Sequence, residues 1–521
     1  MRRGIKYLPM LFIFGLADGS AQNLVRRYDA LGQNRPESGW AVEQLGDSTW
    51  FIVLNGQKQV DAFVYSSVVA GLCIDATGEP QDTILAFEAY LNTYPGWANS
   101  SDLRQDGGVV VGGSSVDTTG TDRPVLYLFN SIGQLDTMYT YGAPGEDWIG
   151  RSAKQTPDGG YIIVGETNTH GTSLDGFLLR LDSAGNQQWV QTYGSASVDE
   201  FLVSVDIGPS GGYYLGGQQT VVGFDDEQWV LRVDSNGQVI WDAHYGTPYD
   251  EGPNAHLTST ADGNAVFAAG WAYNNSNVYQ LGLTKIDSLG TTIWSNAYDT
   301  PAFGSVLYSV KEVSPGGDLI AGGVSYVPGY RQGVLLRTTA LGDSLWLRYY
   351  HYYDTVWSAG RGQIRDVIPT SSGSFIAVGT AYSSNNPNDP PIYGQDTWVV
   401  KVDSMGCLEP GCHVVTGVGT QITNLRSVLR VWPNPVQGQG QGQGQAQGQV
   451  QVAIELPERF VTRGPLRLTL TDAQGRLVQE ESVPQGGSPF SFSLSALAPG
   501  LYHLHLSDAT RWISGAKVVV R

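Results

Sequence analysis

Short apolar runs separated by glycine-rich turns dominate the pattern of hydrophobic and polar positions in this chain. In residues 148–200 the runs YIIVGET and FLLRLDS carry apolar residues at consecutive positions, and the turns PDGG and DSAG bound them. Strands of this composition need cover on both faces, because a strand with one exposed face would alternate. WIGRSAKQT before these runs and WVQTYG after them complete a unit of four antiparallel strands.

This unit recurs along the chain. The turn after LRLD is found at Asp75, Asn130, Asp182, Asp234, Asp287, Thr339 and Asp403, at steps of 55, 52, 52, 53, 52 and 64 residues. The tryptophan of the last strand recurs in phase, at Trp189, Trp241, Trp294 and Trp346. Four-stranded units repeated at this period predict an all-β fold, a seven-bladed β-propeller over residues 23–412.

The two ends of the repeat region favour a closed ring over the alternative, an open solenoid, which would need polar caps. The seventh copy stops at KVDSMGCLEPGC and lacks the W-x-x-x-Y-G strand. NLVRRYDALGQ, residues 23–33, matches that strand, with Tyr28 in the place of Tyr193. We therefore expect an N-terminal strand to complete the last blade and remove the open edge.

The motifs DGGYIIVGE, LLRLDSAG and W-x-x-x-YG carry a resemblance. The repeats resemble the glycine-rich propeller repeats of secreted bacterial proteins, of the kelch-like and delta-60-like sort, over most of residues 41–412. Such motifs specify a blade and not a chemistry.

The C-terminal segment carries VWPNP, LTLTDAQGRLVQE, LSALAPGLYHLHLS and a final KVVVR, in this order. Together they resemble the type A C-terminal sorting domain of the type IX secretion system. The resemblance implies a small β-sandwich over residues 431–521 that engages the secretion machinery and is commonly removed after export. The positions that match the family's motifs are Pro433, Asn434, Pro435, Asp472, Gly475, Gly500, Tyr502 and Lys517. The alternative is an ordinary β-sandwich binding module.

Two stretches are expected to lack regular structure. Residues 413–430 form a predicted linker between the propeller and the sandwich. Residues 437–451 are almost entirely Gln and Gly and have no apolar face to bury, so we expect a flexible loop there.

The N-terminal residues 1–21 have the features of a secretory signal peptide. Arg2, Arg3 and Lys6 precede an apolar run, and small residues precede Gln22. The run is too short for a membrane anchor, which needs ~20 apolar residues. We expect a protein that is secreted or attached to the outer cell surface, without a transmembrane segment in the mature chain.

Charge and cysteine content agree with this location. The formal charge of -19 makes nucleic acid an improbable partner, because the phosphate backbone would be repelled. Oxidising surroundings permit a disulfide between Cys407 and Cys412 in GCLEPGC, and Cys73 is expected to be a buried strand residue. A metal site at these cysteines would need more ligands nearby.

No catalytic motif is found in the sequence. H-E-x-x-H and a P-loop are absent, and the G-x-S-x-G match at residues 208–212 is one of the recurring glycine turns. His503 and His505 share a face of one strand and offer a possible pair of metal ligands, within the sorting module. The catalytic residues, if any, are therefore unknown from sequence.

Aromatic residues concentrate in the loops expected on one face of the ring, the face opposite the DGG and DSxG turns. Beside Asn and Asp they form a surface suited to glycans or peptides, and packing between blades is the alternative. The candidate ligand-binding residues are Tyr273, Tyr279, Tyr326, Tyr330, Tyr349, Tyr350, Tyr352, Tyr353, Trp357, Tyr382 and Tyr393.

An acidic series lies on the same face. Asp147, Asp199 and Glu251 recur at steps of 52 residues, backed by Glu146, Glu200 and Asp250. A ring of carboxylates is a candidate calcium site, and hydrogen bonding to turn backbone is the alternative role. We expect no cofactor other than calcium.

Three hypotheses follow for function. The first is a secreted or surface-attached propeller that binds a glycan or protein through the loop-rich face. The second is a polysaccharide-active hydrolase or lyase with its site in the channel, and the third is a spacer without a ligand. The absence of a catalytic set favours the first.

Overall fold

The computed structural model describes most of the chain. The described residues are 24–31, 35–61, 64–86, 91–169, 171, 173–195, 197–221, 225–247, 251–252, 255–274, 278–298, 304–313, 316–327, 330–352, 361–382, 395–412, 421–423, 425, 428–436, 448–457, 460–484, 488–495, 497–509 and 511–521. The predicted signal peptide lies outside them. The named elements are all β-strands, and the described residues contain no helix long and apolar enough to span a membrane.

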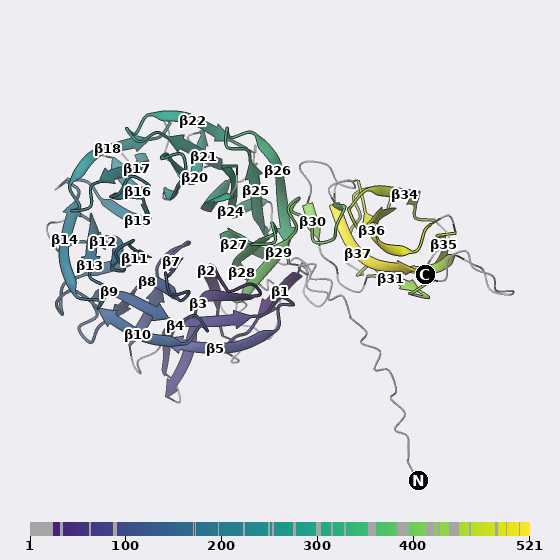
Figure 1. Cartoon of the computed structure of the whole chain (residues 1–521), viewed down its shortest axis with the longest axis horizontal. Coiled ribbons are helices and arrows are strands. Elements are labelled where there is room, and N and C mark those ends of the chain that lie inside the picture. Colours follow the sequence, from purple (N-terminus) through teal and green to yellow (C-terminus); the bar gives the residue numbers. More distant parts are fainter. Residues whose placement is uncertain are drawn as a thin grey trace, which may run out of the picture.

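Antiparallel sheets of about four strands follow one another around a ring, with one strand of each near the centre and another at the rim (Figure 1). The first sheets are β2 (Ser38–Leu45), β3 (Thr49–Asp61), β4 (Val64–Ile74) and β5 (Pro80–Ala86), then β6 (Asn92–Pro95), β7 (Ser101–Leu103), β8 (Val109–Val116), β9 (Asp122–Phe129) and β10 (Leu135–Thr140), then β11 (Trp148–Gln155), β12 (Tyr161–Thr167), β13 (Asp175–Leu181) and β14 (Gln187–Tyr193). The next are β15 (Glu200–Ile207), β16 (Tyr213–Val221), β17 (Asp225–Val233) and β18 (Val239–Tyr245), then β19 (His256–Ser259), β20 (Ala265–Asn274), β21 (Val278–Ile286) and β22 (Thr292–Ala297), then β23 (Ser305–Val313), β24 (Asp318–Val327), β25 (Tyr330–Thr338) and β26 (Ser344–His351). The last sheet joins β27 (Arg361–Pro369), β28 (Phe375–Tyr382), β29 (Gln395–Val402) and β1 (Leu24–Tyr28).

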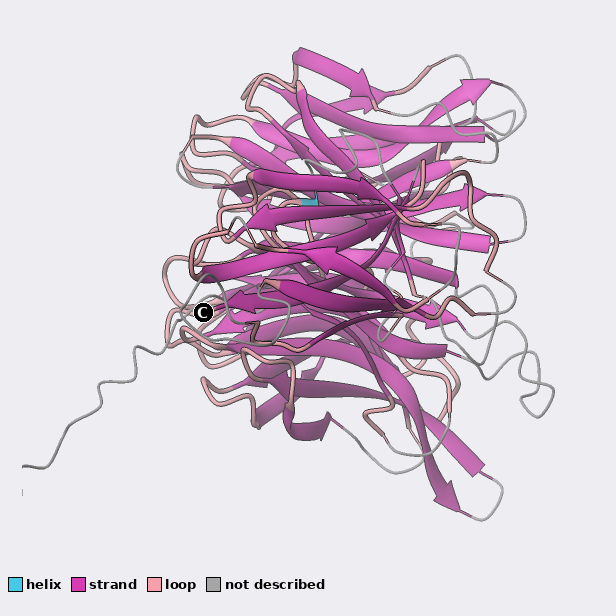
Figure 2. Cartoon of the chain, turned by 90° about the vertical axis from the view of Figure 1, so that its right-hand side faces the viewer, coloured by secondary structure: helices cyan, strands magenta, loops and turns pink. Residues whose placement is uncertain are grey.

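The strands run along the axis of the ring, so the connecting turns gather on its two faces (Figure 2). We call each four-stranded unit a blade. The β1 strand pairs antiparallel with β29, from Leu24 opposite Lys401 to Tyr28 opposite Thr397. The last blade is thus assembled from segments far apart in the sequence.

The blades bury both faces, as the consecutive apolar positions predict. All seven residues of β12 are buried. Ile162 and Val164 of this strand pack in one cluster with Leu202 and Leu215 of the following blade. Burial of each such side chain stabilises the fold by about 1.5–3 kcal/mol, so the repeated apolar runs are accounted for by packing between blades.

A tyrosine near the end of the rim strand links each of several blades to the next one. Its hydroxyl donates a hydrogen bond to the carbonyl of the glycine in the turn after the next blade's third strand, which is DSxG in most copies. The pairs are Tyr28 to Gly78 (2.7 Å), Tyr141 to Gly185 (2.9 Å), Tyr193 to Gly237 (2.8 Å), Tyr245 to Gly290 (2.6 Å), Tyr298 to Gly342 (2.8 Å) and Tyr350 to Gly406 (2.7 Å). The repeated tyrosine is therefore a structural link between blades.

Removing one such hydroxyl tests this role. The variant Tyr141→Phe is expected to lower the free energy of unfolding by about 1 kcal/mol, because the Gly185 carbonyl loses its partner. Tyr139→Phe is the matched control, since the Tyr139 ring lies beside the same glycine. Urea unfolding of both variants measures the difference, and equal losses would contradict the role of the hydroxyl.

The C-terminal module has two sheets. One contains β31 (Leu429–Trp432), β32 (Gln449–Ile454) and β35 (Phe490–Ser493), and the other contains β33 (Arg467–Asp472), β34 (Leu477–Ser482), β36 (Gly500–Ser507) and β37 (Arg511–Val520). Their inner faces share one core that includes Val452, Phe492, Leu470 and Leu504. This is the arrangement of a β-sandwich.

Two boundaries differ from the sequence prediction. Within the predicted linker 413–430, β30 (Gln421–Thr423) pairs in parallel with both β26 and β37, so the sheet of a blade continues into the sandwich (Figure 1). The predicted Gln/Gly loop 437–451 ends too late, because β32 begins at Gln449. Val450 and Val452 give this strand a buried apolar face. Residues 437–447 lie outside the described residues.

Candidate functional site

Five strands, β2, β11, β15, β23 and β27, share an irregularity that places one residue of each out of register. The pairing skips a position between Gly39 and Ala41, Gly150 and Ser152, Leu202 and Ser204, Leu307 and Ser309, and Ile364 and Asp366. Such a bulge leaves the extra residue unpaired and redirects its side chain. The bulge residues are Trp40, Arg151, Val203, Tyr308 and Arg365.

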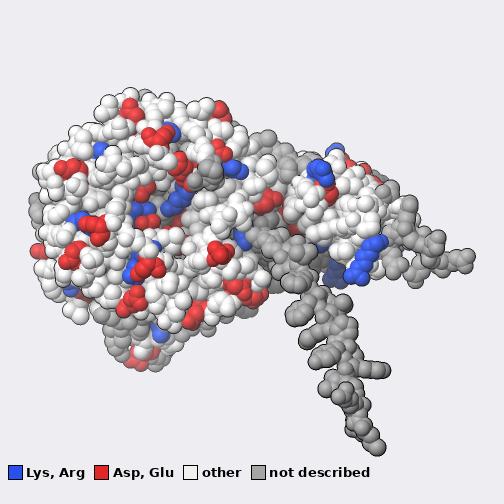
Figure 3. All heavy atoms as spheres, viewed as in Figure 1, with Lys and Arg blue, Asp and Glu red and all other residues white. Residues whose placement is uncertain are grey.

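Three residues further along these strands, charged side chains join blades across the ring. The Lys154 ammonium lies 3.2 Å from Asp102 and 3.6 Å from Asp206, which belong to the two neighbouring blades. Lys311 donates a hydrogen bond to Asn99, although their blades are not adjacent. Lys, Arg, Asp and Glu atoms are visible at the centre of the ring (Figure 3).

Burial and charge together set the protonation of this network. Burial alone would lower the pKa of Lys154, but Asp102 and Asp206 hold that pKa above its usual value. Burial raises the pKa of Glu43 to about 7 against the effect of Lys311. Because these contacts cross the centre, we place the candidate site at the level of the bulges, toward the start of the inner strands.

At that level, aromatic rings and arginines gather over three neighbouring blades. We call this set the mouth cluster, and its members are Trp40, Tyr308, Tyr326, Arg331, Arg365 and Tyr382. Each of them is half-buried.

Two guanidinium groups organise the mouth cluster. The Arg365 guanidinium lies 3.6 Å from the centre of the Trp40 ring, and Arg331 lies 5.1 Å and 5.6 Å from the rings of Tyr326 and Tyr382. With its amide oriented to satisfy its neighbours, Gln363 accepts hydrogen bonds from Arg365 at 2.7 Å and from Tyr382 at 3.1 Å. Such cation–π and hydrogen-bond contacts hold the two arginines in place.

A second group of aromatic residues lies on the β6–β7 and β15 side of the ring. The Arg151 guanidinium lies 4.6 Å from the centre of the Trp97 ring, and its Nη2 lies 2.5 Å from the Glu166 carboxylate. The Trp97 and Phe201 rings meet edge to face at 6.3 Å. Here the arginine is neutralised within the protein.

A buried imidazole lies next to the mouth cluster. His256 is 2% exposed, and its ring centre lies 6.5 Å from that of Tyr308. Burial lowers the pKa of His256 to about 4. Burial also raises the pKa of the Tyr308 hydroxyl, with a further contribution from Tyr326, so at neutral pH both groups are uncharged.

The lowered pKa predicts a loss of stability in acid. Between pH 6.5 and about 4 the unfolded chain binds a proton at His256 that the folded chain does not. The stability that comes from keeping His256 neutral is therefore fully present above pH 6.5, and the free energy of unfolding decreases as the pH falls through this range. Each pH unit of this range lowers the free energy of unfolding by up to about 1.4 kcal/mol. Urea unfolding at pH 6.5, 5.5 and 4.5 should show a shallower fall for His256→Gln than for the wild type. His244→Gln, at a side chain that is 32% exposed, is the control, and an unchanged slope in His256→Gln would contradict the prediction.

The predicted aromatic surface is only partly brought together. Tyr326 and Tyr382 belong to the mouth cluster, and Tyr279 lies on β21, where its ring approaches Gly252. Tyr273 and Tyr330 are strand residues whose side chains lie outside the description. Tyr353, Trp357 and Tyr393 lie outside the described residues.

The placement of Tyr349 and Tyr350 in a loop is wrong, because both lie at the end of the rim strand β26. Tyr350 is 1% exposed and makes the hydrogen bond to Gly406 described above, so it is a core residue. Tyr349 packs against another core cluster, and Tyr352 lies 5.5 Å from the Arg27 guanidinium. These three tyrosines serve packing at the rim.

The acidic series accepts hydrogen bonds from backbone N–H groups. Asp147 accepts from the N–H of Asp122 at 3.0 Å, and Asp199 accepts from that of Leu174 at 2.8 Å. Glu251 accepts from Thr247 and, at 2.7 Å, from Ala272.

The three acids do not form one set. Glu200 accepts from Ser195, five residues before it, and Glu251 accepts from Thr247, four residues before it. Glu251 therefore corresponds to Glu200 and not to Asp199. Among the described residues no three His, Cys, Asp or Glu side chains are grouped to hold a metal ion.

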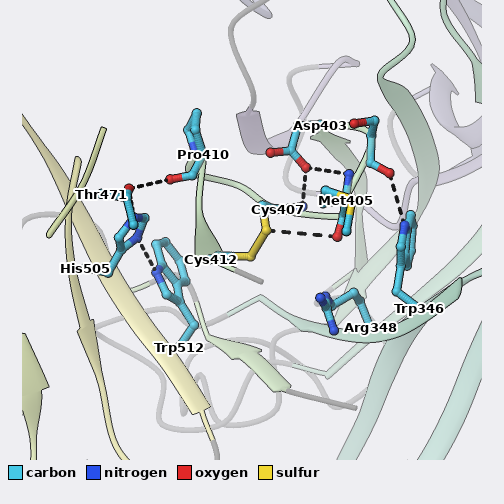
Figure 4. The surroundings of a disulfide bond; sticks show 12 residues. Trp346, Arg348, Asp403, Met405, Cys407, Pro410, Cys412, Thr471, His505 and Trp512 are labelled. Atoms are coloured by element: carbon cyan, nitrogen blue, oxygen red, sulfur yellow. Dashed lines mark hydrogen bonds between the residues drawn. A yellow bond between two sulfur atoms is a disulfide. The ribbon is translucent and has the colours of Figure 1, made fainter. Parts of the chain in front are cut away.

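The cysteines are placed as the sequence suggests. Cys407 and Cys412 form a disulfide, and Cys73 is a buried free thiol on β4 whose pKa burial raises to about 11. The disulfide closes a loop between the last blade and the sandwich, and both sulfurs lie in a core that also contains Trp346 and Trp512 (Figure 4).

The sandwich contacts this loop through both of the histidines considered as metal ligands. Trp512 Nε1 donates to His505 Nδ1 at 3.1 Å, His505 Nε2 lies 3.0 Å from Thr471 Oγ1, and Thr471 Oγ1 donates to the Pro410 carbonyl at 3.1 Å (Figure 4). Since indole only donates, the His505 proton resides on Nε2. His503 Nδ1 lies 3.1 Å from Glu409. The two histidines thus join the module to the propeller.

A glycine permits this close approach. A Cβ on Gly411, whose φ is +92°, would lie 2.6 Å from Thr471 Oγ1. Any other residue would separate the loop from β33 and would be strained in this conformation.

The eight positions carried over from the sorting family form local contacts. Asn434 donates to the Lys517 carbonyl at 2.6 Å, and Pro433 and Pro435 flank it. Asp472 accepts from the N–H of Arg476 at 2.9 Å across the turn that contains Gly475. Tyr502 donates to the Ala498 carbonyl at 2.9 Å, and Gly500 lies beside its ring. These contacts hold the turns of the sandwich.

Comparisons with known proteins identify this module. Residues 430–521 match the family model described as the secretion system C-terminal sorting domain. The type IX sorting domain predicted from the sequence is thereby confirmed, and it indicates secretion and interaction with the type IX machinery. No curated protein sequence matches the chain.

Solved structures with a similar fold include β-propeller proteins. A PL25 ulvan lyase has a TM-score of 0.45 and 9% identity, covering 74% of this chain and 97% of its own. The NanB sialidase from Streptococcus pneumoniae has a TM-score of 0.38 and 11% identity, and the match covers 76% of this chain and 71% of the sialidase. The propeller domain of the Trilobed protease from Pyrococcus furiosus has a TM-score of 0.38 and 8% identity, and the match covers 68% of this chain and 100% of that domain. At these scores the likeness supports no argument about ligand or activity. The chain is a propeller-like, all-β protein with a type IX sorting domain.

Proposed function

We propose that this protein is an extracellular glycan-binding propeller, secreted or held at the cell surface, that takes its ligand at the mouth cluster. The observation that carries the proposal is the stacking of arginines and aromatic rings over three neighbouring blades. Aromatic faces suit the apolar faces of sugar rings, and guanidinium groups donate to sugar oxygens in fixed geometry.

The interior of the ring supports binding at the mouth and not deeper. Lys154, Asp102 and Asp206 are paired with one another, and Lys311 reaches Asn99 from a non-adjacent blade. A polymer that entered below the level of the bulges would therefore meet side chains that already bind one another.

The proposal includes a specific architecture. It has a signal peptide over residues 1–21, seven blades over 23–412 with β1 as the closing strand, a connection over 413–430 and the sorting module over 431–521. The hydrogen bond from Tyr28 to Gly78 supports closure, because it repeats between the last blade and the first the link found between other neighbours. Assignment of the repeats to the kelch-like and delta-60-like sort, and calcium binding by the acidic series, remain predictions.

A polysaccharide-active hydrolase or lyase is the second candidate. His256 favours it, because its imidazole is neutral at pH 7, its Nδ1 has no hydrogen-bond partner among the described residues, and Tyr308 lies beside it. A neutral imidazole is a competent general base when a substrate proton comes within reach.

One experiment separates the two candidates. The full chain is incubated with a glycan and matrix-protein array, with and without calcium, and bound label and released product are recorded together. The proposal expects retention on glycans without product, and loss of retention in Trp40→Ala but not in the control Trp432→Ala, which is 43% exposed in the sorting module. Product release that His256→Gln abolishes would establish the enzyme, and retention on matrix protein alone would overturn the glycan ligand.

A further inference from the structure

The mouth cluster contains positive charge that no carboxylate of the described residues neutralises. The chain has 49 acidic and 30 basic side chains, so carboxylates are in excess. Yet within the described part of the chain neither Arg331 nor Arg365 has a carboxylate within ion-pair distance. Their neighbours are aromatic rings, the Tyr382 hydroxyl and the Gln363 amide. Half-buried cations are ordinarily paired, because their desolvation costs free energy.

An internal comparison shows that the missing partner is specific to one blade. Arg151 and Arg365 are both bulge residues, and each lies over a tryptophan ring. Arg151 is paired with Glu166, which follows Gly165 on the neighbouring strand.

The corresponding position after Gly379 is Thr380, because Gly150 pairs with Gly165 and Ile364 pairs with Gly379. The Thr380 side chain is buried, and its Oγ1 has no hydrogen-bond partner among the described residues. Where one blade supplies an internal anion, the other supplies a hydroxyl.

Around Arg365, the Gln363 amide oxygen accepts from the guanidinium, and the Tyr308 hydroxyl is a donor close by. Burial raises the pKa of Tyr308 above its ordinary value, so its hydroxyl keeps its proton. Burial lowers the pKa of Arg365, although a guanidinium remains protonated at neutral pH. An incoming anion would thus meet a charged guanidinium and a protonated hydroxyl, beside aromatic rings among which Arg365 itself covers one face of Trp40.

We infer that Arg365 and Arg331 bind the anionic group of an acidic polysaccharide, a uronate carboxylate or a sulfate ester, with a sugar ring against the nearby aromatic faces. The inference rests on the proposed function and narrows its ligand to acidic glycans. The ligand's anion takes the place relative to Arg365 that Glu166 takes relative to Arg151. Bidentate pairing of a guanidinium with a carboxylate or sulfate gives both strength and orientation.

The test uses the full chain and three immobilised polymers: polygalacturonate, its carboxyl-reduced neutral counterpart and chondroitin sulfate. The wild type is expected to bind at least one acidic polymer at least tenfold more tightly than the neutral one. Arg365→Gln should weaken that binding by about tenfold or more. Arg365→Lys should recover only part of it, because lysine keeps the charge without the fork.

A restored internal carboxylate gives an independent test. Thr380→Glu places an acid where the other blade has Glu166, so it should neutralise Arg365 and suppress acidic-polymer binding while every arginine is retained. Arg430→Gln, an exposed position in the sorting module, removes one positive charge elsewhere and should change binding less than twofold. Circular dichroism and the unfolding midpoint check that each variant is folded.

The outcomes are distinct. Equal binding of the neutral and acidic polymers, or acidic binding unchanged in both Arg365→Gln and Thr380→Glu, overturns the inference and leaves glycan binding standing. Binding to none of the polymers or other glycans on the array contradicts the proposed function as well. Comparison of the uronate with the sulfated polymer shows which anion is preferred.

Discussion

Replacing Trp512 by alanine is expected to lower the free energy of unfolding by about 3–5 kcal/mol and to detach the sorting module from the propeller. Trp512 is 1% exposed and shares a core with the disulfide, Trp346 and Tyr350. Its indole also fixes the ring of His505, which bonds through Thr471 to the Pro410 carbonyl. The substitution therefore removes both the packing and the first donor of this hydrogen-bond series.

Trp432→Ala is the matched control, because this tryptophan lies in the same module and is 43% exposed. Urea unfolding gives the loss of stability, and limited proteolysis of the connection gives the detachment. If Trp512→Ala costs no more stability than Trp432→Ala and leaves the connection equally resistant, the docked arrangement is contradicted.

The second large effect is expected at β1, the proposed closing strand of the ring. Val25→Asp should cost at least about 3 kcal/mol and promote aggregation, because it places an unpaired charge in a core that contains Trp398 and Phe375. Displacement of β1 would also leave β29 as a free edge, which can pair with other molecules.

The control is Arg27→Ala on the same strand. Arg27 is more exposed and forms an ion pair with Asp396, so its loss should cost no more than about 1 kcal/mol. Size-exclusion chromatography and thermal unfolding of both variants test the prediction. Equal behaviour of the two variants would show that β1 does not hold the ring closed.

Much of the fold could be predicted from the sequence because its markers are structural necessities that recur. The glycine of the DSxG turn has a positive φ, as at Gly185 and Gly237, and a tyrosine of the preceding blade donates to its carbonyl. Such contacts fix a residue type at a fixed phase. The sorting module was predicted from its resemblance to a family, and two of the matching residues, Asn434 and Asp472, each hold a turn.

The candidate site was largely missed because its residues do not recur as a type. The bulge position carries Trp40 in one blade, Arg151 in another and Val203 in a third. The bulge position recurs at the same place in the repeat while its residue type varies, and this variation was the available signal for a binding site. The prediction from aromatic residues instead favoured tyrosines near loops, and it wrongly included Tyr350, which lies on a rim strand.

Other errors arose from small shifts in register. Glu251 lies 52 residues after Asp199, yet it makes the hydrogen bond that corresponds to that of Glu200. The reason is that the loop before Glu251 is one residue shorter than the loop before Glu200. The start of β32 at Gln449 could not be predicted from composition, because the Gln-rich sequence continues into the strand. Pairing with β35 defines this strand instead.

The central claim is that a glycan binds at the mouth cluster, and amide hydrogen exchange with and without the bound polymer tests it most directly. We expect slower exchange in the first residues of β2, β23 and β27 and around Tyr326 and Tyr382, with no change in the DSxG turns such as 182–186 on the opposite face. Slower exchange confined to the DSxG turns or to the rim strand β26 would contradict the account.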